Sequence, residues 1–330
     1  MNKIISKEQF SEKVFKLEIE APLIAKSRRA GHFVIVRVDE KGERMPLTIA
    51  GSNLEKGTIT LVVQTVGLSS TKLCKLNEGD YVLDVVGPLG QATHIQNYGT
   101  VVCAGGGVGV APMLPIIQAL KAAGNRVISV LAGRSKDLII LEEEVRASSD
   151  EVIIMTDDGS YGTKGLVTEG IESVIKREKV DKCFAIGPAI MMKFCCLLTK
   201  KYEIPTDVSL NTIMVDGTGM CGACRITVGG KTKFVCVDGP EFDGHQVDFD
   251  EMFKRMGSFK DVEREEMSHL EQHVCKVEPQ AEAKKSECKP CSEKACQMPM
   301  EELLDRKAPW REELRKAMKP KERTAIHRCP

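Results

Sequence analysis

The sequence predicts a protein of the α/β plus β class, in which an antiparallel β-barrel precedes a parallel-sheet α/β domain and a small cysteine-bearing module. Three observations predict it. Short segments with alternating apolar residues fill the first hundred residues, strand and helix patterns then alternate, and three cysteines follow close together. We expect these parts, and a helical and partly disordered tail, at residues 1–97, 98–206, 207–250 and 251–330.

The predicted barrel rests on four segments in which apolar residues recur at every second position. They are KVFKLEIEA, HFVIVRVDE, TITLVVQTV and DYVLDVVGPLG. Turns rich in glycine, asparagine, glutamate and lysine separate them. Period-two patterning at this spacing is typical of a small antiparallel barrel or sandwich.

Two polar stretches of the predicted barrel suit an anionic, ring-bearing ligand. RMPLTI occupies residues 44–49, and VGLSST at residues 66–71 leads into a short predicted helix. A fixed cation, a rigid proline, a hydroxyl and a helix start with free N–H groups suit a diphosphate and a planar ring. The same residues also occur in surface strands and ordinary helix caps, so the pattern alone leaves both interpretations open.

From residue 98 onward, strand and helix patterns alternate. The predicted strands are TVVCAGGG, RVISVLAG, EVIIMTDDG and CFAIG, and the predicted helices are VGVAPMLPIIQALKAAG, LIILEEEVR, LVTEGIESVIKRE and AIMMKFCCLLTKK. Such alternation predicts a parallel sheet covered on both faces, with a ligand crevice at the carboxyl ends of its strands.

Glycines and carboxylates stand at three of these strand ends. They are Gly105, Gly106, Gly107 and Gly109 after the first strand, Asp157, Asp158 and Gly159 after a later one, and Gly187 and Pro188 after the last. A glycine turn at a helix start is an anion site. One such turn is also an ordinary strand-to-helix connection, but three strand ends converging on one crevice favour a nucleotide site.

The stretch DGTGMCGACRITVGGKTKFVC, residues 216–236, gathers three cysteines and a carboxylate. The tight turn from Cys221 to Cys224 lets two sulfurs point at one centre, and the predicted hairpin ITVGGKTKF would bring Cys236 beside them. Asp216 occupies the position where a C-x4-C-x2-C loop carries its first cysteine. The stretch therefore predicts a [2Fe–2S] site with three thiolates and one carboxylate.

Other kinds of site also use paired cysteines. A C-x2-C pair can be a redox dithiol or half of a zinc site, but zinc more usually takes a second C-x2-C or a histidine pair at matching spacing, and this stretch has neither. Gly217, Gly219 and Gly222 favour the cluster, because a loop around it needs close backbone approach and N–H groups aimed at sulfur. The alternative from another class is a zinc-stabilised, nucleotide-binding regulatory module without turnover.

Composition and charge restrict the partners and the cellular compartment that the sequence predicts. Lysine plus arginine and aspartate plus glutamate both number 47, so nothing in the overall charge points to nucleic acid as a partner. We expect no membrane span and a cytoplasmic protein, since no apolar run is long enough and MNKIISKEQF lacks a signal-peptide core. In such a chain, 13 cysteines favour cofactor ligation and free thiols over a disulfide framework.

The quoted stretches also carry a family resemblance. RMPLTI, the Gly-Ser-Ser-Thr helix start, AGGGVGVAPM, MTDDGSYGTKG, AIGPAIMM and the cysteine loop, in this order, resemble the ferredoxin–NADP reductase superfamily. More narrowly, roughly residues 1–250 are similar to electron-transfer subunits that carry flavin and a [2Fe–2S] cluster. These include the dihydroorotate dehydrogenase electron-transfer subunit and the small (alpha) subunit of NADH-dependent ferredoxin:NADP oxidoreductase, also known as a sulfide dehydrogenase subunit.

The resemblance implies roles for matching positions. Arg44 would neutralise the FAD diphosphate, and Thr48 would lie near the reactive nitrogen of the isoalloxazine ring as the catalytic residue. Pro46, Leu47 and Thr48 would border the ring, and Gly67, Ser69, Ser70 and Thr71 would bind the diphosphate. The site for the nicotinamide nucleotide would be lined by Gly107, Gly109, Asp157, Asp158 and Gly187. The cluster would be held by Asp216, Cys221, Cys224 and Cys236.

The resemblance also implies an activity and a partner. NADH or NADPH would reduce FAD, and the [2Fe–2S] cluster would exchange single electrons with a larger flavoprotein. This partner would carry FAD and [4Fe–4S] clusters and would serve ferredoxin. Complexes of this type include electron-bifurcating enzymes. Arg134 could meet a 2′-phosphate, so the choice between NAD(H) and NADP(H) stays open.

Two departures from the family pattern matter. Ile186 stands where the superfamily often has a cysteine before Gly187, so no thiol is assigned to hydride transfer. Asp216 replaces the first of four cysteines of the dihydroorotate subunit, which makes service to a dihydroorotate dehydrogenase the alternative rather than the first hypothesis.

The tail gives weaker signals. FDEMFKRMGSFKDVEREEMSHLEQH has helical spacing, and VEPQAEAKKSECKPCSEKA is a linker by composition. Cys288, Cys291 and Cys296 lack a nearby fourth ligand, which favours free thiols over a metal site, and Trp310 suits a docking contact. The final residues resemble the run-in to the large subunit, which suggests a truncated, split or once-fused gene.

Overall fold

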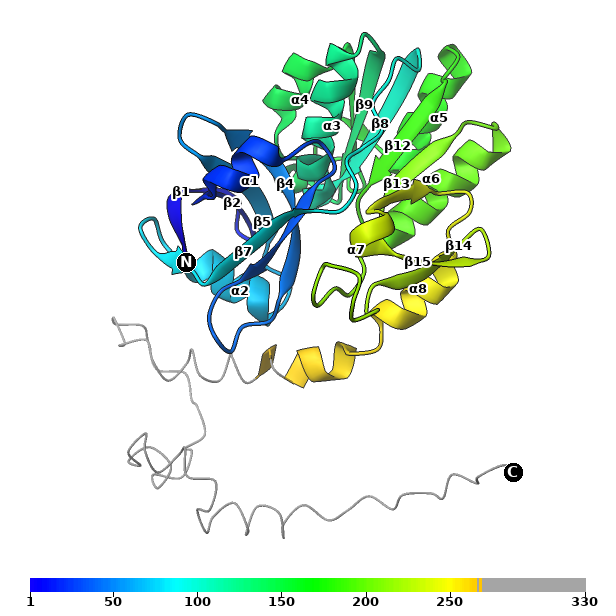
Figure 1. Cartoon of the computed structure of the whole chain (residues 1–330). Coiled ribbons are helices and arrows are strands. Elements are labelled where there is room, and N and C mark those ends of the chain that lie inside the picture. Colours follow the sequence, from blue (N-terminus) through cyan, green and yellow to red (C-terminus); the bar gives the residue numbers. More distant parts are fainter. Residues whose placement is uncertain (266, 269–330) are drawn as a thin grey trace, which may run out of the picture. The chain divides into compact units, whose positions relative to one another are not determined.

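Seven antiparallel strands of the first hundred residues form a nearly closed barrel in the computed structural model, which describes residues 1–265, 267 and 268 (Figure 1). The order across the sheet is β6-β1-β2-β5-β4-β3-β7. The strands are β1 (Asn2–Ser11), β2 (Val14–Glu20), β3 (Phe33–Arg37), β4 (Met45–Asn53), β5 (Thr58–Gln64), β6 (Tyr81–Val82) and β7 (Asp84–Leu89), and the helices are α1 (Pro22–Ser27) and α2 (Leu68–Lys75).

The four predicted segments contain β2, β3, β5 and the pair β6 and β7, whereas β1 and β4 are strands that the pattern did not indicate. The reason is clearest for β4. Its first half, Met45–Thr48, pairs with β3, and its second half, Ile49–Asn53, pairs with β5. Pro46 lies in the half that pairs on one side only, where a missing N–H is tolerated.

Strand alternation divides the barrel residues between two faces. Val34 and Val36 of β3 point inward and join a core of Ile4, Leu17, Ile19, Ile49, Ile59, Leu61 and other buried apolar residues. Phe33 and Ile35 point outward and belong to the core shared with the next domain. The outward face of β3 and β4 is therefore one of the barrel surfaces that pack against the described residues that follow.

A second sheet follows, with the order β11-β10-β9-β8-β12-β13-β16. Its strands up to β13 pair in parallel. They are β8 (Thr100–Gly106), β9 (Arg126–Gly133), β10 (Glu151–Thr156), β11 (Thr163–Lys164), β12 (Lys182–Ile186) and β13 (Thr206–Ser209), and the helices are α3 (Val110–Ala122), α4 (Glu142–Ser148), α5 (Val167–Arg177) and α6 (Ala189–Lys201). α3 and α4 cover the face that meets the barrel, and α5 and α6 cover the other (Figure 1). The predicted fold class is thereby confirmed.

Two details of this domain differ from the prediction. The segment LIILEEEVR becomes helical only from Glu142, because Leu141 adopts a left-handed backbone with φ 54° and interrupts the chain direction. β13 follows α6 and straddles the expected boundary at residue 206. The division into domains stays a prediction.

The cysteine module contains β14 (Arg225–Val228), β15 (Lys231–Phe234), α7 (Val235–Asp238), β16 (Glu241–Asp243) and α8 (Phe249–Met256). β14 and β15 form the predicted hairpin, with Gly229 and Gly230 at positive φ in its turn. β16 pairs antiparallel with β13, so this module adds the last strand of the parallel sheet.

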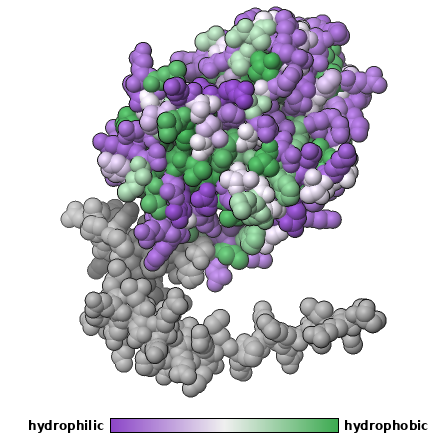
Figure 2. All heavy atoms as spheres, in the orientation of Figure 1, coloured by the Kyte–Doolittle hydropathy of each residue, from purple (hydrophilic) through white to green (hydrophobic). Residues whose placement is uncertain are grey.

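Apolar residues gather near the middle of the face shown in Figure 2, around the junction of the barrel and the α/β domain. Residues 260–265 continue the chain beyond α8 as a helix. The predicted linker, Cys288, Cys291, Cys296 and Trp310 lie outside the described residues. Among the described residues, none of the helices has the length and apolar character needed to span a membrane.

Candidate functional site

Two of the predicted ligands, Cys224 and Cys236, lie side by side. Their Sγ atoms are 3.2 Å apart, and both side chains are buried. The hairpin turns the chain back so that the backbone N–H of Val235 donates to the carbonyl of Cys224. Burial raises the pKa of the Cys236 thiol to about 12, so a thiolate forms here when a bound cation compensates its charge.

Asp216 lies with Cys221 at the other end of the loop. Its Oδ1 accepts from the N–H of Thr218 at 3.0 Å, and its Oδ2 accepts from the N–H groups of Met220 and Cys221, both at 2.9 Å. These hydrogen bonds lower the pKa of Asp216 to about 2, and the bond from Thr218 contributes most. An ionised carboxylate offers about four acceptor positions. Three are filled by N–H groups, which leaves capacity for a metal.

The four predicted ligands thus form two pairs, Cys224 with Cys236 and Asp216 with Cys221. Within residues 1–265, 267 and 268, no three histidine, cysteine, aspartate or glutamate side chains are grouped around one ion. A [2Fe–2S] cluster takes two protein ligands on each iron, and each pair has the donor number that one iron requires. Cys221 is exposed while Cys224 and Cys236 are buried, and one pair therefore faces solvent and the other the protein.

The glycines of the loop have the backbone that the sequence required. Gly217, Gly219 and Gly222 have φ of 76°, 86° and 68°, in the left-handed region. A Cβ on Gly217 would stand 2.8 Å from Leu89 Cδ1 and 2.9 Å from Ile35 Cγ1. The absence of a side chain at Gly217 therefore lets the cluster loop lie directly on the outward face of the barrel.

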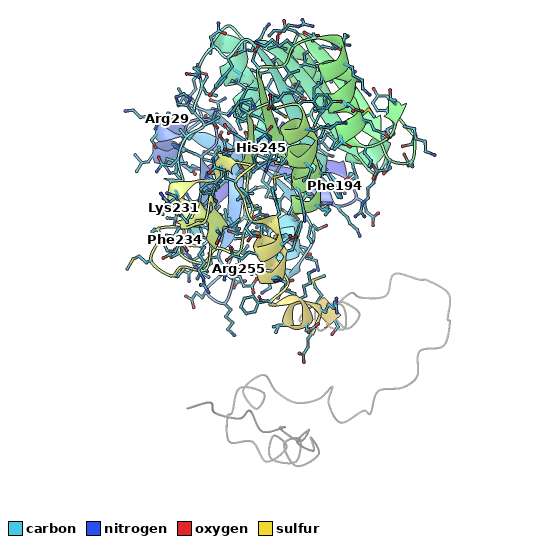
Figure 3. All side chains as sticks on the ribbon, turned by 90° about the vertical axis from the view of Figure 1, so that its right-hand side faces the viewer. Arg29, Phe194, Lys231, Phe234, His245 and Arg255 are labelled. Atoms are coloured by element: carbon cyan, nitrogen blue, oxygen red, sulfur yellow. The ribbon has the colours of Figure 1, made fainter. Side chains whose placement is uncertain are left out.

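Two arginines hold the loop from different sides. Arg44, just before β4, donates through Nε to the carbonyl of Val215 at 2.6 Å. Arg255 of α8 donates through Nη2 to the carbonyl of Ala223, between two ligands, at 2.9 Å. Figure 3 labels Arg255 and Phe234; the Phe234 ring lies against the turn, since a Cβ on Gly222 would stand 3.7 Å from Phe234 Cε1. Sequence reasoning missed Arg255, because only the packing of α8 brings it to the loop.

The outward face of β4 connects this loop with the α/β domain. Pro46 and Thr48 pair with Ile35 and Phe33, whose side chains point outward, so both share that face. Ala50, the next residue on the same face, packs against the start of α3. Thr48 therefore lies between the cluster loop and the first helix of the α/β domain.

Other residues expected around the flavin take different positions. Leu47 points to the opposite face and packs against the barrel core. The Ser70 hydroxyl accepts from the N–H groups of Val66 and Gly67 and is buried, so it caps the start of α2. Ser69 donates to Glu43 at 2.7 Å, and Gly67 and Thr71 complete the turn. Their roles toward a diphosphate stay predictions.

The glycine turns of β8 and β12 meet at the carboxyl edge of the sheet. A Cβ on Gly109 would stand 2.5 Å from the carbonyl oxygen of Ile186 and 2.8 Å from Gly187 Cα, so the two strand ends approach this closely because Gly109 has no side chain. Gly107, with φ 53°, has open space at its Cβ position. The turn before α3 thus leaves room for a ligand beside its N–H groups.

Asp157 and Asp158 lie further along the same edge. The N–H of Asp157 donates to Gly133 and that of Asp158 to the carbonyl of Arg134, which joins the ends of β9 and β10. Both side chains are exposed. Parallel strands place all these residues at one edge, as predicted.

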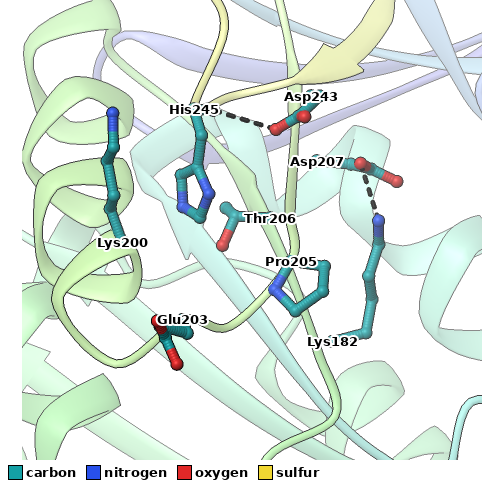
Figure 4. Close-up of a pocket in the computed structure, with 8 residues that line it drawn as sticks. All are labelled: Lys182, Lys200, Glu203, Pro205, Thr206, Asp207, Asp243 and His245. Atoms are coloured by element: carbon teal, nitrogen blue, oxygen red, sulfur yellow. Dashed lines mark hydrogen bonds and ion pairs between the residues drawn. The ribbon is translucent and has the colours of Figure 1, made fainter.

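A cavity of about 520 Å³ lies at the opposite edge, where β12 and β13 begin (Figure 4). Its lining includes the ion pair of Lys182 and Asp207, 2.7 Å apart. It also includes His245, whose backbone N–H donates to Asp243 Oδ1 at 3.0 Å. It is separate from the glycine turns and the cluster ligands.

Glu241 of β16 is a second residue that the sequence did not single out. Its Oε1 accepts from the hydroxyl of Thr93, in the segment between the two sheets, at 2.7 Å. Burial first, and then Asp207, raise the pKa of Glu241 to about 7. Because Glu241 lies in a polar stretch of the sequence, no local pattern indicates that its side chain is buried and bonded to Thr93.

Comparison with known proteins agrees with this geometry. Residues 211–248 match the iron-sulfur cluster binding domain of dihydroorotate dehydrogenase B. The homolog of the dihydroorotate dehydrogenase B (NAD(+)) electron transfer subunit from Thermotoga maritima is 50% identical over 264 residues, which cover 80% of this chain and 93% of the relative. A probable subunit of this kind from Methanopyrus kandleri is 31% identical, over 69% of this chain and 83% of its own length.

Solved structures show the same relationship. A chain in the structure of the NADH-dependent reduced ferredoxin–NADP oxidoreductase, studied for flavin-based electron bifurcation, is 47% identical with a TM-score of 0.77, over 81% of this chain and 98% of that one. A ferredoxin NADP+ reductase from Neisseria gonorrhoeae, at 16% identity and a TM-score of 0.50 over 61% and 89% of the two chains, shares the fold. The predicted resemblance is confirmed, and the chain belongs to the family of dihydroorotate dehydrogenase B electron transfer subunits and their homologues.

Proposed function

We propose that the chain is an oxidoreductase subunit that passes electrons between NAD(P)H, FAD and a [2Fe–2S] cluster, and onward to a larger flavoprotein. The observation that carries this proposal is the outward face of β4. Ala50 on that face packs against α3, beyond the glycine turn, while Ile35 next to Pro46 packs against Gly217 of the cluster loop. A flavin ring at Thr48 would lie between nucleotide and cluster.

Each cofactor has residues that suit it. Thr48 would offer a hydroxyl to the ring of FAD, and the turn at Gly107 has open space for a nucleotide diphosphate, with Gly109 allowing the close approach to Gly187. The exposed Asp157 and Asp158 suit the ribose. A bound flavin would supply the conversion between a hydride, which carries two electrons, and the single electrons that a cluster accepts. The apolar junction around β4 would exclude water from the ring.

The partner and the setting are part of the proposal. The relatives are named as electron transfer subunits, and the structural neighbour comes from a ferredoxin–NADP oxidoreductase. We infer a larger partner with FAD and [4Fe–4S] clusters that serves ferredoxin, in the cytoplasm, without nucleic acid. Asp216 in place of a cysteine favours this partner over a dihydroorotate dehydrogenase.

The experiment is cofactor analysis of the full chain, purified anaerobically from its native host together with whatever binds it. We expect FAD, iron and acid-labile sulfide in a ratio of one flavin to two irons to two sulfides per chain, as a [2Fe–2S] flavoprotein requires. NADH or NADPH should bleach the flavin absorbance. Zinc alone, without flavin, would contradict the proposal and support the regulatory module.

A second candidate is service to a dihydroorotate dehydrogenase, which the matched cluster domain at residues 211–248 favours. Identification of the co-purified subunit separates the two. A dihydroorotate dehydrogenase in the complex, with orotate formation coupled to NAD+ reduction, would support this second function. A subunit with [4Fe–4S] clusters and ferredoxin-dependent activity would exclude it.

A further inference from the structure

Two successive carbonyls of the turn from Cys221 to Cys224 are each bonded to a guanidinium group. Arg255 donates through Nη2 to the carbonyl of Ala223 at 2.9 Å, and Arg225 donates through Nη1 to the carbonyl of Gly222 at 3.2 Å. In a trans peptide, which is planar, the C=O and the N–H point in opposite directions. An arginine that holds one of these carbonyls therefore turns the N–H of the following residue away from itself.

The peptides of this turn lead to the predicted ligand sulfurs. The N–H of Ala223, which shares its peptide with the Gly222 carbonyl, points at Cys221 Sγ, 3.5 Å away. The N–H of Cys224 shares its peptide with the carbonyl that Arg255 holds. Hydrogen bonds to the sulfurs are among the influences that set the reduction potential of an iron–sulfur cluster. Arg255 thus fixes the orientation of the peptide that leads into the buried ligand Cys224.

The packing of α8 holds Arg255 in this place. Figure 1 shows α8 next to the hairpin of β14 and β15, and Glu251 Oε2 accepts from the backbone N–H of Thr227 in β14 at 3.0 Å. Phe249 and Met252 are buried in the apolar core that also contains the two buried ligand cysteines. The helix that carries Arg255 is therefore fixed to the same module as the ligands.

Arg255 also brings a positive charge to a site of negative charge. Three thiolates and one carboxylate would surround the cluster, and one-electron reduction would add a further negative charge. A guanidinium stays protonated at physiological pH. Because Arg255 is half-buried, solvent and salt screen its charge less than that of an exposed residue.

We propose that Arg255 is a positioning residue for the [2Fe–2S] cluster, which orients the peptide leading into Cys224 through the Ala223 carbonyl and raises the reduction potential of the cluster. The inference rests on the proposed function, because it requires the cluster. A nearby fixed cation stabilises the reduced form relative to the oxidised form, since the reduced form carries one more negative charge.

The test compares three variants of the full chain as purified holoprotein. Arg255→Gln removes the charge and the guanidinium, and Arg255→Lys keeps the charge and one donor group. The matched control is Lys254→Gln, which removes the same charge at the exposed neighbour of Arg255. Both residues lie in the last turn of α8, so the control also reports the lost interaction with the helix C-terminus. The measurements are iron and FAD content, the electron paramagnetic resonance spectrum of the dithionite-reduced cluster, and its midpoint potential by redox titration.

For Arg255→Gln we expect full FAD content, an altered resonance spectrum and a roughly tenfold lower ratio of reduced to oxidised cluster at a fixed potential, about 59 mV for one electron. Arg255→Lys should have a potential between those of Arg255→Gln and the parent chain, and Lys254→Gln should match the parent chain.

The spectrum and potential of the parent chain in Arg255→Gln, or an equal shift in Lys254→Gln, would overturn the inference. If Arg255→Gln holds no iron, Arg255→Lys decides. A recovered cluster in that variant supports the inference, whereas a chain without iron assigns Arg255 to the folding of α8 and overturns it. A parent chain that binds neither FAD nor cluster would instead contradict the proposed function.

Discussion

At the level of single residues, Asp216 has two roles: its carboxylate accepts hydrogen bonds from the loop backbone, and it is a predicted iron ligand. Its carboxylate accepts three backbone N–H groups, one of them from Cys221, with which it forms a predicted ligand pair. For Asp216→Cys we expect the cluster still to assemble, because a thiolate is the usual ligand, but with stronger visible absorption from the added sulfur and a changed potential. Optical spectra and redox titration measure both.

The matched control is Asp238→Asn, since Asp238 also accepts a backbone N–H, from Phe234, in the same module. It should leave the spectrum and the potential as they are. An Asp216→Cys protein with the spectrum and potential of the parent chain would show that Asp216 is not bound to iron.

At the level of elements, the packing of the cluster loop on the barrel depends on Gly217. Gly217→Ala would place a Cβ within 3 Å of Leu89 and Ile35, at a φ of 76°. We expect a loss of roughly 1–3 kcal/mol in the free energy of unfolding and a broadened cluster spectrum, as the loop moves off β3. Chemical denaturation and electron paramagnetic resonance measure the two effects.

The control substitution Gly230→Ala separates the cost of backbone strain from the cost of disrupted packing. Gly230 has nearly the same φ, 74°, but open space at its Cβ position. It should cost only the backbone strain and leave the cluster spectrum unchanged. Equal effects of the two substitutions would contradict the close contact between loop and barrel.

At the level of the whole molecule, Glu241 joins the cysteine module to the segment between the sheets through Thr93. Its pKa is raised from 4.5 to about 7, mainly by burial, with Asp207 and Lys182 as the nearby charges. The folded state therefore holds a proton that the unfolded state releases above about pH 4.5. The stability that this proton contributes is present below pH 4.5 and is lost as pH rises through 7.

The comparison of Glu241→Gln with the parent chain isolates this contribution. The amide keeps an acceptor for Thr93 without a charge, so the variant should gain stability relative to the parent between pH 5 and pH 8. Urea unfolding at the two pH values measures the difference. A constant difference between variant and parent over this range would refute the assignment.

Local chemistry explains which parts of the molecule the sequence could predict. The hairpin, the glycine turns and the grouping of Asp216 with three cysteines depend on neighbours in the chain. The structure confirms the hairpin and places the predicted ligands in two pairs, Cys224 with Cys236 and Asp216 with Cys221. β4 was missed because its pairing changes partner midway. The contacts of Arg44 and Glu241 join residues more than a hundred positions apart, and no local pattern encodes them.

β16 has a consequence for any attempt to dissect the chain. It covers the backbone of β13 at the border of the parallel sheet. A shortened polypeptide ending before residue 241 would leave β13 with a bare row of N–H and C=O groups, which invites association between copies and aggregation. The iron-binding segment thus shields its neighbour from self-association, and transplanting either part alone would require a substitute strand.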